Sequence, residues 1–140
     1  MQVFRLGSDY VIRLDPGEEI VESVTAFCQT VDIPAASVSG IGAVSRCEIG
    51  RYALSEKHFV SKTYEGEFEI IALNGNITKK DGEPYVHLHL AFADEDLNMH
   101  GGHLTSGVIS LTAEIVIKVL NGSLERTLHE ETGINRLAEP

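Results

Sequence analysis

The chain has 140 residues, of which 43% are hydrophobic and 23% are charged. This length suits a single domain whose apolar core holds it folded without a disulfide or a metal. Eleven Lys and Arg against 21 Asp and Glu give a net charge of −10, which opposes binding along a nucleic-acid backbone. No stretch approaches the roughly 20 apolar residues that span a membrane, and the N-terminus has no targeting pattern, so a cytoplasmic protein is expected.

The first part of the chain predicts a strand pair followed by a helix. Short apolar stretches at 3–6 and 10–14 flank a Gly-Ser-Asp sequence that favours a turn. Asp15-Pro16-Gly17-Glu18 then has the order of a helix start, with the aspartate as N-cap and the glutamate able to bond back to it. Apolar residues from 20 to 31 recur at the spacing of one helix face.

Strand candidates fill most of the remaining chain. With so few helices available as crossovers, we expect one α+β domain over 1–140, with a mostly antiparallel sheet packed by one main amphipathic helix. Residues 133–140 are expected to form a loose tail. Cys28 and Cys47 are expected to be buried free thiols, since their spacing fits neither a disulfide framework nor a metal pair. The strand candidates are 51–54, 58–64, 67–79, 85–93, 108–120 and 124–129.

Four of the six histidines lie in the run YVHLHLAFADEDLNMHGGHL at 85–104. Because side chains alternate across a strand, His87 and His89 share one face with Tyr85, while Leu88 and Leu90 face the other side. Two imidazoles at this spacing lie roughly 6 to 7 Å apart at the backbone, close enough to converge on one ion. On its own, such a pair is more often part of a polar, solvated strand face than of a metal site.

His103 is the natural third ligand, because Gly101-Gly102 would let the backbone turn tightly and approach the histidine strand. His100 is expected in the loop, either as a fourth ligand or as an exposed residue. His58 and His129 have no partner in the sequence and are expected to have surface or structural roles. Three neutral imidazoles with an open coordination position favour Zn²⁺, with Fe, Ni or Mn as alternatives. Such an ion polarises water or a carbonyl.

Two carboxylates are candidates for proton transfer near such a site. Glu114 alternates onto the less apolar side of its strand, together with Ser110 and Thr112, and Glu69 is a comparable candidate. Either could orient a ligand histidine or act as a general base. The alternative for both is a solvated or interface carboxylate.

Six short motifs follow one another along the chain: Leu14–Ile20, Val38–Ala43, Gly66–Ile71, His87–His89, Gly101–Leu104 and Thr112–Glu114. In this order they resemble the plant and prokaryote conserved (PPC) domain over nearly the whole chain. The resemblance implies an α+β domain with a mostly antiparallel sheet, assembled as a homotrimer. Stand-alone prokaryotic members are labelled DNA-binding by analogy with plant relatives that carry AT-hooks. This chain has no Arg-Gly-Arg-Pro hook and is strongly acidic, so that label transfers poorly.

The histidine motifs also resemble the H-x-H and Gly-Gly-His ligands of α-acetolactate decarboxylase, a zinc enzyme of related fold. That resemblance implies a metal site on His87, His89 and His103. No arginine near these motifs is an evident partner for a substrate carboxylate, so decarboxylase activity is not carried over.

Two hypotheses of function follow. The first is a cytoplasmic homotrimer that holds a divalent metal on the three histidines and acts on a small oxo-acid or ester, with Glu114 or Glu69 as proton carrier. The second is a trimeric regulatory module that binds a protein or, less readily, DNA. The second is suggested by the family label and by the segment 66–70, which resembles a partner-binding motif of the plant relatives.

Overall fold

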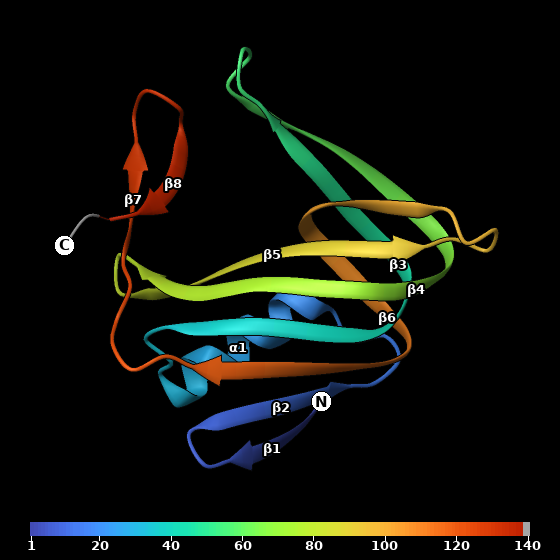
Figure 1. Ribbon diagram of the computed structural model, residues 1–140, viewed down its shortest axis with the longest axis horizontal. Coiled ribbons are helices and arrows are strands. Elements are labelled where there is room, and N and C mark those ends of the chain that lie inside the picture. The colour runs from blue at the N-terminus through green and yellow to red at the C-terminus, as the bar shows by residue number, and fades with distance from the viewer. Residues whose placement is uncertain (139–140) are drawn as a thin grey trace.

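Eight strands and one helix make up residues 1–138, the part of the chain that the computed structural model describes (Figure 1). The elements are β1 (Gln2–Leu6), β2 (Asp9–Leu14), α1 (Ile20–Val31), β3 (Ala36–Ala53), β4 (His58–Lys80), β5 (Glu83–Ala93), β6 (Met99–Val119), β7 (Arg126–His129) and β8 (Ile134–Leu137). Six strands form an antiparallel sheet in the order β1-β2-β6-β3-β4-β5, while β7 and β8 form a separate hairpin. The α+β prediction is confirmed. No helix in residues 1–138 is long and apolar enough to cross a membrane.

The predicted strand pair is present as the β1–β2 hairpin, but the helix starts later than the sequence suggested. Its N-cap is Glu19, whose carboxylate accepts a hydrogen bond from the Glu22 backbone N–H. One of the two bonds predicted there does form: the Glu18 carboxylate accepts from the Asp15 N–H at 2.8 Å, while the Asp15 carboxylate bonds Arg13 instead of capping a helix. The bond from Asp15 to Glu18 closes only a turn, because Gly17 has a positive φ of 87°, a left-handed conformation that cannot continue as an α-helix.

Strands β3 and β4 are longer than predicted. The candidates at 58–64 and 67–79 form one strand of 23 residues, which passes through Gly66 at a φ of 156°. A bulge in the β3–β4 pairing, between Val44 and Arg46, lies near this position. Pairing of β3 with β6 ends at Gly50, and residues 51–60 form the end of the β3–β4 hairpin, an arm that extends away from the rest of the sheet (Figure 1).

Strand β6 closes the sheet on itself. Its first residues pair with β5, and its later residues pair with β3 and β2. Strands β3, β4, β5 and β6 therefore form a closed circuit of hydrogen-bonded neighbours. His103 occupies the junction, since it pairs with His89 of β5 on one side and with Gly50 of β3 on the other.

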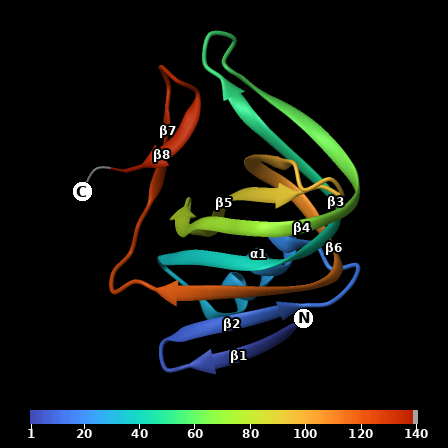
Figure 2. The same ribbon diagram turned by 45° about the vertical axis from the view of Figure 1, so that its right-hand side comes forward.

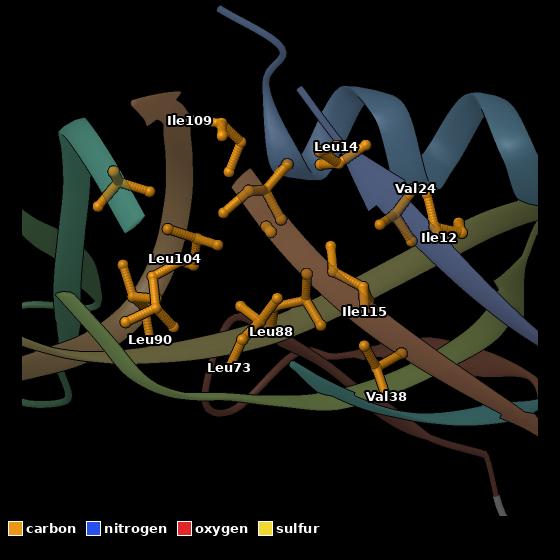
Figure 3. Close-up of a cluster of buried hydrophobic side chains, with 14 of the residues drawn as sticks. Ile12, Leu14, Val24, Val38, Leu73, Leu88, Leu90, Leu104, Ile109 and Ile115 are labelled. Atoms are coloured by element: carbon orange, nitrogen blue, oxygen red, sulfur yellow. The ribbon is translucent and has the colours of Figure 1, made fainter. Parts of the chain in front are cut away.

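The apolar core lies between α1 and the sheet (Figures 2 and 3). Val24 of the helix lies near Ile12 of β2, and Leu88 of β5 lies beside Leu73 of β4 (Figure 3). All four are at most 1% exposed, and burying each such side chain contributes about 1.5–3 kcal/mol. Burial of Leu88 fixes the register of β5, and it directs the neighbouring histidines to the other face. Both cysteines are free and buried, as predicted.

The predicted loose tail at 133–140 is wrong over residues 134–137, which form β8. A tight turn joins β7 to β8, with the Gly133 N–H donating to the His129 carbonyl at 2.7 Å. The Tyr52 hydroxyl also donates to the Thr132 carbonyl at 2.5 Å, which ties the hairpin to β3. The Tyr52–Thr132 bond joins residues 80 positions apart in the chain. The sequence pattern of a short polar segment does not reveal them. Residues 139 and 140 lie outside the described part of the chain.

Candidate metal centre

His87, His89 and His103 come together on the face of the sheet opposite the core, as the sequence predicts. Each offers a ring nitrogen, and the three nitrogens lie within 4.8 Å of one another. The ring centroids are 5.1 to 5.6 Å apart. Nitrogens around a tetrahedral ion with bonds of 2.0–2.1 Å would lie about 3.4 Å apart, a distance that small side-chain rotations can reach. This group could therefore hold a metal ion.

Glycine allows this approach, although not by forming a turn. Gly101 and Gly102 lie inside β6, and a Cβ on Gly102 would come within 2.7 Å of the Gly50 carbonyl oxygen. The absence of a side chain thus lets β3 and β6 pack closely beside His103. The chain reverses earlier, at 94–98, where the Asp94 carboxylate accepts from the Asn98 N–H at 2.9 Å. The predicted tight turn at the glycines is wrong, while the predicted close approach is confirmed.

The other histidines stay apart from this group. His100 lies in β6 rather than in the loop, and its Nε2 is 2.8 Å from the Asp94 carboxylate. It is not part of the three-histidine group found among residues 1–138, so a fourth-ligand role is not supported. His58 is exposed, and His129 hydrogen-bonds within its own hairpin segment.

A buried arginine that no local motif of the sequence reveals lies behind the site. Arg126, on β7, is 7% exposed, and its guanidinium carbon lies 5.0 Å from the centre of the Tyr85 ring. Its position 39 residues from His87 leaves no local motif by which the sequence could have revealed it. The guanidinium donates to Thr78 Oγ1 at 3.0 Å, Asn76 Oδ1 at 2.8 Å and the Asn135 carbonyl at 3.1 Å, and lies 3.4 Å from His87 Nδ1.

This environment favours neutral imidazoles. Burial, followed by the nearby His103, Arg126 and His89, lowers the pKa of His87 to about 4. Burial and the nearby His89 also lower the pKa of His103. A metal binds the neutral form of histidine, which has a free lone pair on nitrogen. These two rings are therefore ready to act as ligands at neutral pH.

The three histidines border a cavity of about 480 Å³. Tyr52 and Phe59 of the β3–β4 arm line it, as do Tyr85 of β5 and Ile134 of β8. Figure 1 shows the arm and the β7–β8 hairpin rising on the same side of β5. Arg51 also lines the cavity, and no Asp or Glu among the described residues does. Only Tyr85 could have been predicted from the sequence, because it alternates onto the same face as the histidines.

The two candidate carboxylates lie elsewhere in the same chain. Glu114 is exposed and lines a second cavity, of about 510 Å³, together with Ser39, Ile71 and Asn74. Glu69 is exposed on β4, opposite Ala93 of β5. Neither is among the described residues that line the histidine cavity.

Solved structures similar to this chain carry different descriptions. A "putative dna binding protein" from Bacteroides thetaiotaomicron has a TM-score of 0.95 at 28% identity, covering 98% of this chain and 96% of its own. A metal-containing protein from Archaeoglobus fulgidus has a TM-score of 0.86 at 33% identity, covering 99% and 100%. Acetolactate decarboxylase from Bacillus subtilis subspecies spizizenii has a TM-score of 0.57 at 18% identity, covering 83% and 54%, and shares the fold alone.

Curated relatives are larger proteins. The chain is 36% identical over 110 residues to the bifunctional protein GlmU of Synechococcus sp. (strain JA-3-3Ab), covering 77% of this chain and 16% of that protein. It is 33% identical over 116 residues to AT-hook motif nuclear-localized protein 8 of Arabidopsis thaliana, covering 77% and 28%. The shared region is thus a small part of each relative. The family model that matches residues 1–121 describes the Plants and Prokaryotes Conserved (PCC) domain, the family to which this chain belongs.

Proposed function

We propose that this chain binds a divalent metal ion, with zinc as the preferred ion, on His87, His89 and His103. The observation that carries the proposal is the convergence of three ring nitrogens within 4.8 Å of one another on one face of the sheet. A set of three nitrogen donors suits zinc, and Fe, Ni or Mn are the alternatives. The description of the Archaeoglobus fulgidus protein as metal-containing supports the same assignment.

We further propose that the site acts on a small oxo-acid or ester. A metal ion held there supplies Lewis acidity, which polarises a carbonyl or activates water. The chain itself contributes neutral ligand rings, since burial first and then His103 and Arg126 lower the pKa of His87. It also contributes a cavity of about 480 Å³ in which a small molecule fits.

Glu114 and Glu69 remain the predicted proton carriers. The proposal also includes assembly of the chain as a homotrimer. Neither carboxylate lines the histidine cavity of its own chain, so a role for either requires a neighbouring copy to bring it there. Exposed apolar side chains next to Glu114, among them Ile41 and Ile71, support self-association through this face. The cytoplasmic location expected from the sequence also stays a prediction.

Metal analysis of protein purified without an affinity tag tests the proposal. We expect about one ion per chain in the wild type, and a loss of most of it in His87→Ala and His103→Ala. His58→Ala is the matched control, because this exposed histidine is not part of the group and its variant should keep the metal. A wild type as free of metal as its His87→Ala variant would refute metal binding.

The chemistry is tested separately on the metal-loaded protein. Screening against small esters, lactones and oxo-acids should reveal turnover that His89→Ala abolishes. Turnover unchanged in that variant would exclude this mechanism, whatever the metal content.

The second candidate function is a regulatory module that binds DNA or a protein, supported by the description of the Bacteroides thetaiotaomicron relative. The net charge of −10 disfavours the DNA branch, since attraction to phosphates supplies most non-specific affinity. A gel-shift titration at low ionic strength tests it, and the absence of any retardation would remove DNA from consideration. A pull-down from lysate of the source organism tests the protein branch.

A further inference from the structure

Phe59 presents an apolar ring to the histidine cavity. Tyr52 pairs with Phe59 across β3 and β4, and Gly50, two residues before Tyr52, pairs with His103, so these residues share one face of the strands. The Phe59 and His103 ring centroids are 4.9 Å apart, yet Phe59 remains 47% exposed. An exposed apolar ring beside three convergent histidines is typical of a ligand contact.

The Phe59 ring is held in place by Tyr52. The two ring centroids lie 5.7 Å apart in an edge-on arrangement, and the Tyr52 hydroxyl donates to the Thr132 carbonyl at 2.5 Å. An aromatic surface that is ordered before binding loses little entropy when a ligand packs on it. The cavity volume of about 480 Å³ lies within the range of small-molecule sites, roughly 300–1,000 Å³. This wall therefore suits a ligand with a flat, apolar body.

Tyr85 supplies a hydrogen-bond donor to the same cavity. It lies on the face of β5 that carries His87, and its ring centre is 5.0 Å from the Arg126 guanidinium carbon. The Asn135 side-chain amide donates to the Tyr85 hydroxyl at 3.5 Å, and no acceptor in the described part of the chain takes the hydroxyl proton. The Tyr52 hydroxyl, by contrast, already donates within the chain. Tyr85 is therefore free to donate to an oxygen of a ligand.

Among the described residues, no charged side chain is placed on this face of the cavity. Arg51 alternates to the opposite face of the arm, where it lines a separate cavity with Ile49 and Lys62. Arg126 lies behind Tyr85 and donates to acceptors within the chain, and no described Asp or Glu lines the cavity. A ligand carboxylate would lose hydration here without a side-chain partner, whereas an uncharged carbonyl needs only one donor.

We propose that the cavity binds an uncharged carbonyl compound with a flat aromatic body, and that an aryl ester is its substrate. Phe59 packs on the aromatic body, and the Tyr85 hydroxyl donates to an oxygen of the ligand. This proposal rests on the function proposed above and narrows its substrate class from a small oxo-acid or ester to an aromatic ester.

NMR titration of the untagged, zinc-loaded protein with three stable probes tests the ligand class. Acetophenone carries an aromatic body and an uncharged carbonyl, acetone lacks the ring, and benzoate carries a carboxylate instead. Acetophenone should bind at least about tenfold more tightly than either of the others, and its ring protons should show nuclear Overhauser contacts to Phe59. Equal binding of acetone would overturn the aromatic body, and equal or tighter binding of benzoate would overturn the choice of an uncharged ligand.

Variants of Phe59 test the apolar contact. Phe59→Ala should weaken acetophenone about tenfold and leave acetone unchanged. Phe4→Ala is the matched control, because this β1 side chain is similarly exposed, at 48%, and does not line the cavity. Undiminished affinity in Phe59→Ala would refute the role of Phe59. If that variant also lost mass in light scattering, a second copy of the chain rather than a ligand would cover the ring.

Tyr85→Phe tests the hydrogen bond, since it keeps the ring and removes only the hydroxyl. Acetophenone should bind this variant about fivefold more weakly, while toluene, which has no oxygen, should bind it as it binds the wild type. Tyr10→Phe is the matched control, because the Tyr10 ring packs on Phe27 of the helix and does not line the cavity. Unchanged affinity for acetophenone in Tyr85→Phe, at an unchanged melting temperature, would contradict the role of Tyr85.

The same titrations on metal-free protein separate this proposal from the metal site. If the wild type binds zinc but shows no preference for acetophenone, the ligand class is wrong and the metal proposal stands. If the wild type binds no zinc but retains a preference that depends on Phe59, the metal proposal is wrong and recognition of the aromatic body stands.

Discussion

His87 combines three features that favour metal binding over a merely polar strand face. Its ring is half-buried, a guanidinium lies 3.4 Å from its Nδ1, and two other imidazoles lie within 5.3 Å of its ring centroid. Each of these disfavours a proton on the ring, and together they lower the pKa to about 4. Neutrality is costly for folding at low pH but is the condition that a metal ligand requires.

The pH dependence of stability tests the state of His87 in metal-free protein. Its folded pKa of about 4 lies below the ordinary value of 6.5, so the unfolded chain takes up this proton first as the pH falls. His87 should therefore destabilise the fold progressively from about pH 6.5 to pH 4. In His87→Asn this contribution is absent. Melting temperatures across that window should shift in favour of the variant as the pH falls, and a constant difference between the two proteins would contradict the low pKa.

Arg126 is expected to stabilise both the C-terminal hairpin and the site. Arg126→Ala removes three hydrogen bonds and leaves Thr78 and Asn76 with unsatisfied polar groups, so we expect a loss of about 3 kcal/mol in the free energy of unfolding. The melting temperature should fall by roughly 10 °C. The pKa of His87 should rise, because the guanidinium helps to lower it.

Arg136→Ala is the control for this prediction, since it removes the same charge from the exposed surface of the same hairpin. Thermal unfolding of both variants measures stability, and histidine titration by NMR measures the pKa. Equal small losses in the two variants would show that the buried contacts of Arg126 contribute little.

At the scale of elements, the approach of β3 to β6 fixes the position of His103. A Cβ on Gly102 would lie 2.7 Å from the Gly50 carbonyl oxygen, a backbone atom that cannot rotate away. Gly102→Ala should therefore separate the strands beside the site, cost about 1–3 kcal/mol and weaken metal binding. In Gly101→Ala the nearest atom would be 3.1 Å away, so a smaller loss is expected. Thermal unfolding and metal titration of the pair test this, and equal effects would argue against a close-approach role.

Local sequence patterns predicted the parts of the fold that depend on side-chain alternation within one strand. Alternation in 85–93 placed two histidines on one face because Leu88 and Leu90 are buried on the other. Gly17 shows the limit of such patterns: the predicted bond from Glu18 to Asp15 is present, yet the left-handed backbone at Gly17 ends this turn and the helix begins only after Glu19. Arg126 was missed for a different reason, since its partners come from β4, β5 and β8 and only the folded chain brings them together.

At the scale of the molecule, the chain keeps its acidic residues away from the histidine cavity. The net charge of −10 resides elsewhere on the surface, and the described residues that line the cavity include aromatic rings and no carboxylate. An acidic exterior repels polyanions, whereas a cavity lined by no carboxylate among the described residues, with buried Arg126 behind it, repels a small anion less. The charge distribution thus favours a small-molecule site over a nucleic-acid surface.

The face around Glu114 exposes apolar side chains that a second copy of the chain could cover. Ile41, Ile71 and Val116 are 57%, 49% and 43% exposed there and line the same second cavity. Exposed apolar groups gathered on one face favour contact between copies. For the proposed homotrimer, light scattering with size exclusion should give three times the mass of one chain. Ile71→Glu should give a single chain, because each contact would then bury an unpaired carboxylate.

Leu97→Glu is the control for this last prediction. Leu97 is 78% exposed in the connection between β5 and β6 and does not line the second cavity, so the same charge introduced there should leave the mass unchanged. A trimer that survives Ile71→Glu would place its interface on another face. Loss of bound metal together with the trimer would show that the histidine site is complete only in the assembly, whereas metal retained by the single chain would show that one protomer is sufficient.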